Sequence, residues 1–376
     1  MIPRAPRAPR APGTPRAPRT PGAAARPAAP RAGNLPTGTG QAPCHHGEIL
    51  QGVFLDGAGR RCAGLVTLPM AGPGSSAAFV RRAGAPPGTL TVAPADRTKA
   101  ARAAALAVTE CARRTGQPPC GGELRLSGAI PVGLGMGSSS SDVIAAVRAV
   151  ADSYGLRLEP STVAALAVRA ELASDPLMLS GRPVLFAQRE GRVLEDLGPA
   201  LPPLVVVGCA LGGGAPVDTL SLPVPDVADV DESDVRACER LRALLRRAVA
   251  TGSTELLGAV ATASARRGQQ VLGHPEFDAL AAIARRVGAV GVQIAHSGAV
   301  AGVLFDPAAP GLRRRVGGCL HALAAHGIPA TRTFTTFTGT GSTPPKEIPD
   351  HGPAHHGVDR PARPDTPRRP ARLPAL

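Results

Sequence analysis

One short run of the chain, residues 131–142, combines glycines and serines in a pattern that suits anion binding. Gly133, Gly135 and Gly137 alternate, and the serines at 138–141 follow them directly. Glycine lets a backbone come close to a ligand, and a helix that begins here would direct its free N–H groups at the same place. The run therefore predicts a phosphate-binding turn, with a plain glycine–serine turn as the alternative. It is neither a Walker A loop nor a dinucleotide fingerprint, because no Gly-Lys-Ser/Thr follows and the glycine spacing differs.

Two carboxylates further along the chain are spaced for joint action. Glu171 and Asp175 stand at i and i+4, at the end of a helix expected over 161–173. At this spacing both acids lie on one helix face, where they repel each other unless a cation lies nearby. A bound metal ion would supply that cation, whereas two solvated surface acids are the alternative. Asp142 competes for the same chemistry, although its place in the first turn of a helix suits a purely stabilising role.

The glycine–serine run resembles the phosphate-binding motif of the GHMP kinases, with Met136 where Leu is usual. Two other segments support the resemblance. Residues 47–52, Gly-Glu-Ile-Leu-Gln-Gly, are similar to the first motif and closest to the bacterial L-threonine kinase-like members. Residues 293–306 resemble the third motif, with departures at His296, Ala299, Val300 and Ala301.

The resemblance implies ATP and Mg²⁺ as cofactors, and it implies a site divided among several segments. Asp175 is expected to be the catalytic carboxylate, with Ser139 and Glu171 as metal ligands. His46, Gly47 and Glu48 are expected near the acceptor, with His45 as a further candidate for the same pocket. A local hydrogen bond at the end of a strand is the alternative for both histidines. The expected nucleotide contacts are Pro131, Gly133, Gly135, Gly137, Ser138, Ser139, Ser140, Ser141, Lys99, Ser297 and Gly298, and a solvated helix lysine is the alternative for Lys99.

Helix and strand patterns interleave irregularly, which predicts an α+β fold. The resemblance implies two lobes, an N-terminal one like domain 2 of ribosomal protein S5 and a C-terminal ferredoxin-like one. We expect disordered tails at 1–37 and 337–376, an ATP-binding domain at 38–195 and a second domain at 200–336. Apolar periodicity predicts helices over 99–114, 139–154, 161–173, 234–250 and 275–287, and strands over 123–126, 204–207 and 300–305.

Composition narrows the classes of partner. The chain has 376 residues and a formal net charge of +14, with only 2% aromatic residues. Much of the positive charge falls in the two tails and few aromatic side chains are available for base stacking, so a nucleic-acid partner is not expected. The seven cysteines are an odd number without a CxxC pair, which indicates reduced thiols and a cytoplasmic location. No segment reads as a membrane span, and the oligomeric state stays open.

These observations predict an ATP-dependent kinase that transfers the γ-phosphoryl group to the hydroxyl of a small molecule. L-Threonine or a related hydroxy acid is the expected acceptor, and an isoprenoid or a sugar is the alternative. A second class of function also stays open. It is a non-catalytic nucleotide- or metabolite-binding protein on the same fold, favoured by the altered third motif.

Overall fold

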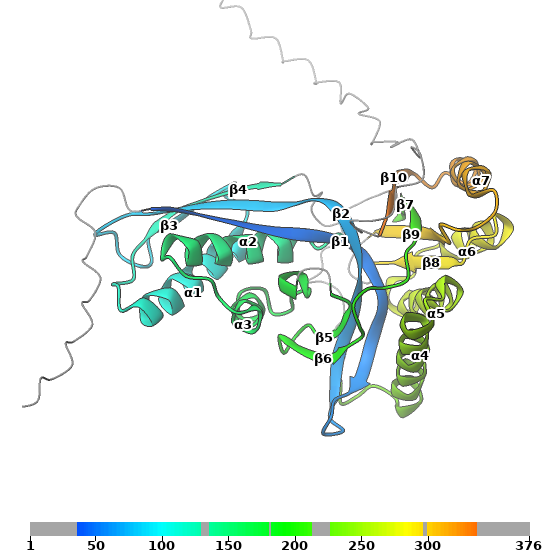
Figure 1. The fold of residues 1–376 in the computed structure, drawn as a ribbon, viewed down its shortest axis with the longest axis horizontal. Helices are drawn as coiled ribbons and strands as arrows, with labels where there is room; N and C mark the ends of the chain where they lie inside the picture. Colours follow the sequence, from blue (N-terminus) through cyan, green and yellow to red (C-terminus); the bar gives the residue numbers. More distant parts are fainter. Residues whose placement is uncertain (1–35, 129–134, 180–181, 213–225, 296–298, 337–376) are drawn as a thin grey trace, which may run out of the picture. The chain divides into compact units, whose positions relative to one another are not determined.

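The structure is a computed structural model, and it describes residues 36–128, 135–179, 182–212, 226–295 and 299–336 (Figure 1). Apart from Pro36 and Thr37, the tails that the sequence predicts to be disordered lie outside these residues. Four of the expected nucleotide contacts, Pro131, Gly133, Ser297 and Gly298, lie outside them as well.

A six-stranded sheet forms the first half of the chain, with the strand order β3-β4-β2-β5-β6 and β1 paired with β2. The β1–β2 pair is a long antiparallel hairpin that extends beyond the helices α1, α2 and α3, and these helices lie along one side of the sheet (Figure 1). The elements are β1 (Thr37–Leu55), β2 (Arg61–Arg81), β3 (Leu90–Ala93), α1 (Thr98–Thr115), β4 (Gly122–Gly128), α2 (Ser138–Ser153), α3 (Pro160–Glu171), a 3₁₀ turn (Leu177–Leu179), β5 (Val184–Ala187) and β6 (Arg192–Asp196).

A four-stranded antiparallel sheet with the order β10-β7-β9-β8 forms the second half. Helices α4 and α5 both pack against β1, and α5 also packs against β8, so α5 joins the long hairpin to this second sheet. The elements are β7 (Val205–Ala210), α4 (Glu232–Thr251), α5 (Thr254–Leu272), α6 (Phe277–Arg286), β8 (Gly291–Ile294), β9 (Val300–Phe305), α7 (Leu312–Ala325) and β10 (Ala330–Thr335).

Small side chains let β1 lie directly on α2. A Cβ atom added at Gly40 would lie 2.2 Å from the backbone oxygen of Ala145, which is far inside van der Waals contact. Ala145 and Ala149, which lie on the side of α2 that faces β1, are fully buried. The sheet and the start of α2 are therefore held in a close, fixed relation.

Strand β1 is irregular where it passes the start of α2. Its pairing with β2 shifts register between Ala42 and Cys44, between His45 and Glu48, and between Glu48 and Leu50. Such β-bulges locally break the alternation of side chains and re-aim them. The bulged stretch carries the expected acceptor residues.

The predicted α+β class is confirmed, and each of the helices and strands expected from periodicity has a counterpart. Helix α3 begins at Pro160, whose fixed φ suits a first helical position. Asp231 occupies the N-cap position of α4. The domain boundaries at 195 and 200 remain a prediction.

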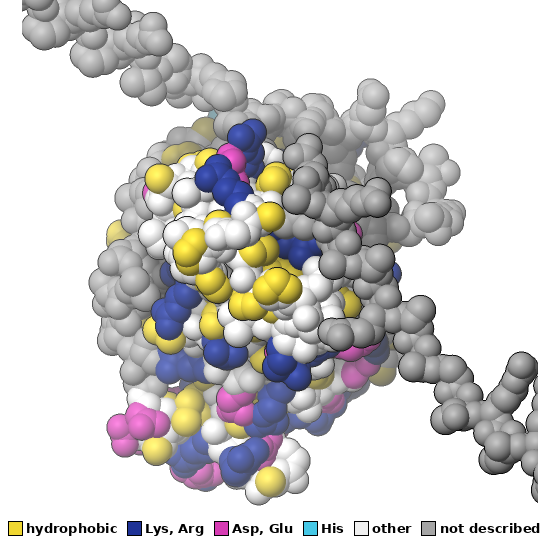
Figure 2. All heavy atoms as spheres, turned by 90° about the vertical axis from the view of Figure 1, so that its left-hand side faces the viewer, with side chains coloured by type: hydrophobic (Ala, Val, Ile, Leu, Met, Phe, Trp, Pro, Cys, Tyr) yellow, Lys and Arg dark blue, Asp and Glu magenta, His cyan; other side chains and the backbone are white. Residues whose placement is uncertain are grey.

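All seven cysteines are buried, and none of them forms a disulfide bond in the described part of the chain. Within the described ranges, no helix combines the length and the apolar character that crossing a membrane requires. Figure 2 shows Lys and Arg side chains scattered over one face, with Asp and Glu side chains between them. The expected absence of a nucleic-acid partner remains a prediction.

Candidate active site

The first turn of α2 presents free backbone donors, as the glycine–serine run predicts. Gly137 occupies the N-cap position with φ +68°, and no side chain caps the helix. The first backbone donor of the helix to find an internal partner is the N–H of Ser141, which donates to the Gly137 oxygen at 2.8 Å. The N–H groups of the preceding serines therefore lie at the positive end of the helix dipole, where an anion is favoured.

Three of the serines, Ser139, Ser140 and Ser141, divide between two sets of hydrogen bonds. Ser139 donates to Oε2 of Glu171 at 2.8 Å, and Ser140 donates to Oε1 of the same carboxylate at 2.9 Å. Ser141 is fully buried; its hydroxyl donates to the Ala42 oxygen and accepts from the N–H of Ser75. The structure therefore does not bring the Ser141 side chain to a ligand, and that hydroxyl joins α2 to the first sheet.

Glu171 has the features of a cation ligand. Its side chain is buried at the end of α3, and in the described part of the chain it forms no ion pair with a basic group. The pKa of Glu171 is raised to about 7, mainly because the carboxyl group is buried. The hydrogen bond from Ser139 lowers this pKa, and the negative charge of Asp175 raises it. Carboxylate and hydroxyl oxygens are hard ligands of the kind Mg²⁺ takes. The residues present thus fit a magnesium ion.

Asp175 is held from two sides. Its backbone N–H donates to the Ser140 hydroxyl at 3.0 Å, so the residue is tied to the start of α2. Its Oδ2 atom lies 3.0 Å from Nε2 of His45 on β1, and the carboxylate side chain remains about 20% exposed. A carboxylate that is fixed in place and still partly accessible can receive the hydroxyl of an acceptor.

Both ring nitrogens of His45 face acceptors. Nδ1 lies 3.1 Å from the Gly47 oxygen, while Nε2 faces Asp175. Only a doubly protonated imidazole can donate in both directions. Burial by itself lowers the pKa of His45, but the charge and hydrogen bond of Asp175, followed by the charge of Glu48, raise it to about 9. His45 is therefore a buried cation at neutral pH.

The His45 cation acts in turn on Asp175. Burial alone would raise the pKa of the Asp175 carboxyl, yet the His45 charge and its hydrogen bond outweigh burial and hold that pKa below its usual range. Lys99, half-buried in the first turn of α1, adds a smaller effect in the same direction. This places the Lys99 charge within electrostatic reach of the site, and the expected contact of Lys99 with a nucleotide remains a prediction.

The structure places the expected acceptor residues of β1 in two different surroundings. Glu48 is brought to the site, since ligand atoms of His45, Glu48 and Asp175 all lie within 4.8 Å of one another. His46 instead points toward the second sheet, where Nδ1 lies 3.1 Å from Oε1 of Gln293 and the ring lies 5.0 Å from that of Phe334. Burial lowers the pKa of His46 to about 4, so this ring is neutral.

Three further expected positions can be placed. Gly135 adopts a positive φ of +85° in the described end of the glycine–serine turn, and Gly47 has a φ of +67° beside Gln293. Asp142, the competing carboxylate, accepts from the Ser75 hydroxyl and pairs with Arg97 Nε at 3.1 Å. Asp142 therefore has a structural role, and Asp175 is the stronger candidate for the catalytic carboxylate.

Of the two histidines that precede Gly47 in the sequence, His45 is the one that the structure brings to Asp175. The tandem histidine before Gly47 was a visible signal, but the choice between the two rings depends on which one faces α2. Neighbouring residues in a strand point to opposite faces, so one of the two was bound to turn away.

Comparison with known proteins confirms the resemblance that the motifs suggested. Residues 99–178 match the family described as the GHMP kinases N terminal domain. An L-threonine kinase of Citrobacter freundii is 28% identical over 188 residues, which is 47% of this chain and 60% of that protein. The chain therefore spans less than two thirds of the length of this relative.

Solved structures share the fold at low sequence identity. A homoserine kinase from Cytophaga hutchinsonii is 17% identical with a TM-score of 0.57, and the match covers 80% of this chain and 94% of that one. A protein described as MDDEF, in complex with MVAPP, AMPPCP and magnesium, is 12% identical with a TM-score of 0.54, with coverage of 80% and 97%. The fold class predicted from the GHMP kinase motifs is thereby confirmed.

Proposed function

We propose that this protein is an ATP-dependent small-molecule kinase that transfers the γ-phosphoryl group to a hydroxyl acceptor. The observation that carries the proposal is the convergence of Ser139, Glu171 and Asp175 at the start of α2. Ser139 donates to Glu171, and the Ser140 hydroxyl links Glu171 to the backbone N–H of Asp175. The relatives named as L-threonine and homoserine kinases support a hydroxy amino acid as acceptor. L-Threonine or a related hydroxy acid is therefore our first candidate.

The chain's own residues divide the work of binding. The free N–H groups at the start of α2 bind phosphate oxygens, and Ser139 and Glu171 would hold Mg²⁺, as a neighbour solved with AMPPCP and magnesium supports. When bound, the ion neutralises charge that builds on the phosphate oxygens during transfer. Glu171 would exchange its hydrogen bonds from the serines for the ion.

Asp175 would act on the acceptor. Its free oxygen orients the acceptor hydroxyl, whose oxygen bonds to the γ-phosphorus while the bond from phosphorus to the β-bridging oxygen breaks and ADP leaves. The hydroxyl proton passes to Asp175. A carboxylate of low pKa suffices because the transition state of phosphoryl transfer is loose, so the proton leaves late and positioning matters most.

The test is a search for turnover with a defined acceptor panel. The purified full chain is incubated with Mg²⁺–ATP and, separately, L-threonine, L-homoserine, L-serine, mevalonate and galactose. ADP release is measured, and each product is examined for the mass of an added phosphoryl group. A phosphorylated product from one acceptor, made by wild type and by Asp278→Asn on the exposed start of α6 but not by Asp175→Asn, is the expected result. Nucleotide binding without turnover on any acceptor would instead identify a non-catalytic binding protein.

A further inference from the structure

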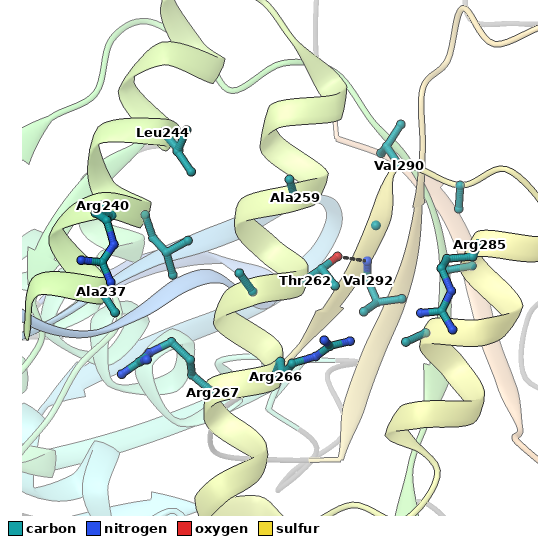
Figure 3. A pocket seen from close by; sticks show the side chains of 16 residues that line it. Ala237, Arg240, Leu244, Ala259, Thr262, Arg266, Arg267, Arg285, Val290 and Val292 are labelled. Carbon is teal, nitrogen blue, oxygen red and sulfur yellow. Dashed lines mark hydrogen bonds between the residues drawn. The ribbon is translucent and has the colours of Figure 1, made fainter. Parts of the chain in front are cut away.

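A groove lies on the second half of the molecule, between α4, α5, α6 and strand β8 (Figure 3). Its volume is about 700 Å³, which is within the range of small-molecule sites. None of its described lining residues belongs to the candidate active site. The groove is therefore a separate place at which a ligand could bind.

Arginines surround this groove. Arg240, Arg266, Arg267 and Arg285 line it, and no acidic residue is among its described lining residues. Arg267 is paired with Asp234 at 2.6 Å. The other three have no carboxylate partner in the part of the chain that the structure describes, and Figure 3 shows Arg266 directed from α5 toward the side where Arg285 lies. The groove thus offers cations without counter-charges.

The floor between the arginines is apolar. Alanines of α4, α5 and α6 form this floor, and their short methyl side chains leave space between the helices. Val290 and Val292 border the floor beside β8. Leu244 at the α4 edge is 37% exposed, which is unusual for a large apolar side chain in this molecule. An apolar surface left open beneath cations fits a ligand that has both kinds of surface.

We propose that this groove binds an organic phosphate with an aliphatic body. A phosphate monoester carries nearly two negative charges and three acceptor oxygens, and guanidinium groups bind phosphate through paired N–H donors. Arg266 and Arg285, from two adjacent helices, hold the phosphate, and the aliphatic part covers the alanine floor near Leu244. A carboxylate has one charge and two oxygens, so it satisfies the same cations less well.

The proposal is tested by calorimetric titration of the full chain with hexyl phosphate. Three further probes each lack one feature of hexyl phosphate. Inorganic phosphate lacks the aliphatic chain, 1-hexanol lacks the charge, and hexanoate lacks the second negative charge. We expect hexyl phosphate to bind at least tenfold more tightly than phosphate or hexanol, and at least threefold more tightly than hexanoate. Equal affinity for inorganic and hexyl phosphate would overturn the proposal, since the apolar floor would then contribute nothing.

Variants of the groove show where hexyl phosphate binds. The double variant Arg266→Gln/Arg285→Gln should lower the affinity for hexyl phosphate at least tenfold, while Arg247→Gln, on an exposed part of α4 outside the groove, should change it less than twofold. Ala259→Leu should weaken binding at least threefold by filling space over the floor, at an unchanged melting temperature. Ser139→Ala should leave this binding unchanged, which separates the groove from the candidate active site.

Two outcomes would refute the proposal. One is an affinity for hexyl phosphate that the double variant leaves unchanged. The other is a concentration-dependent dimer in sedimentation that Ala259→Leu disrupts, which would show that a second copy of the chain covers the groove.

Discussion

Nε2 of His45 and Oδ2 of Asp175 lie 3.0 Å apart, although 130 positions separate the two residues. The pair links β1 to the segment that follows α3. The other ring nitrogen, Nδ1, donates to the Gly47 oxygen, so the orientation of the imidazolium ring is fixed. This pair makes Asp175 an ionised and immobile carboxylate, and the first two predictions depend on it.

Replacing His45 by Gln should move the acidic limit of activity. The amide can still donate a hydrogen bond, but it is neutral, so the pKa of Asp175 rises when the His45 charge is lost. As the pH falls, the variant therefore loses activity at a higher pH than wild type does. The acidic limb of the kcat–pH profile should shift upward by about one pH unit or more. The measurement is kcat from pH 3 to 9, a range that includes the ordinary titration range of a carboxyl group. An acidic limb at the wild-type position would show that His45 does not control the charge of Asp175.

Asp175→Asn should separate binding from catalysis. The amide keeps the shape of the side chain but cannot accept the acceptor's proton, so kcat should fall by about 10²–10⁴, as for the loss of a general base. Affinity for Mg²⁺–ATP, measured by calorimetry, should change less than threefold. Asp278→Asn is the matched control and should behave as wild type. Loss of metal-dependent nucleotide binding in Asp175→Asn would make this residue a metal ligand.

Glu171→Gln should stabilise the metal-free protein at alkaline pH. The folded pKa of Glu171 is about 7, above its ordinary value, so the folded state holds an extra proton and the free energy of unfolding falls as pH rises from 4.5 to 7. The neutral variant avoids this loss, and its melting temperature at pH 8 should exceed that of wild type by about 2 °C or more. Added Mg²⁺–ATP should then stabilise wild type more than the variant. A lower melting temperature of Glu171→Gln at pH 8 would contradict this account.

Gly137→Ala tests the close packing between the helix start and His45. A Cβ atom at this position would lie 2.4 Å from Cδ2 of the His45 ring, so the ring must move away from Asp175. Gly155→Ala is the matched control, since its φ is also +68° but nothing lies within 4 Å of the added atom. Both changes add backbone strain of about 1 kcal/mol, yet only Gly137→Ala should lower kcat, by tenfold or more. Equal losses in the two variants would attribute the effect to strain alone.

The parts of the site that local sequence encodes were predictable. The glycine–serine turn and α2 are specified within some 25 residues, because glycine, serine and apolar periodicity each act locally. The pairing of His45 with Asp175 was not predictable, since it depends on how β1 passes α2. His46, which we expected at the acceptor, faces Gln293 for the same reason. Helix α5 was missed because Gly258 and scattered threonines weaken its helical pattern, while its packing on β1 and β8 stabilises it.

The bulges of β1 make the site sensitive to chain length as well as to residue type. Three register shifts fall between Ala42 and Leu50, and they set which of two adjacent histidines meets Asp175. Loss or gain of one residue in this stretch would exchange the faces of His45 and His46 without altering the composition of the site. The ring turned toward Asp175 would then take up the charge and the ring beside Gln293 would be neutral, because the surroundings of each ring set its pKa. Tandem histidines therefore preserve a charged ring beside Asp175 when this stretch changes length by one residue, whereas a related chain with a single histidine here would lose the charge pair.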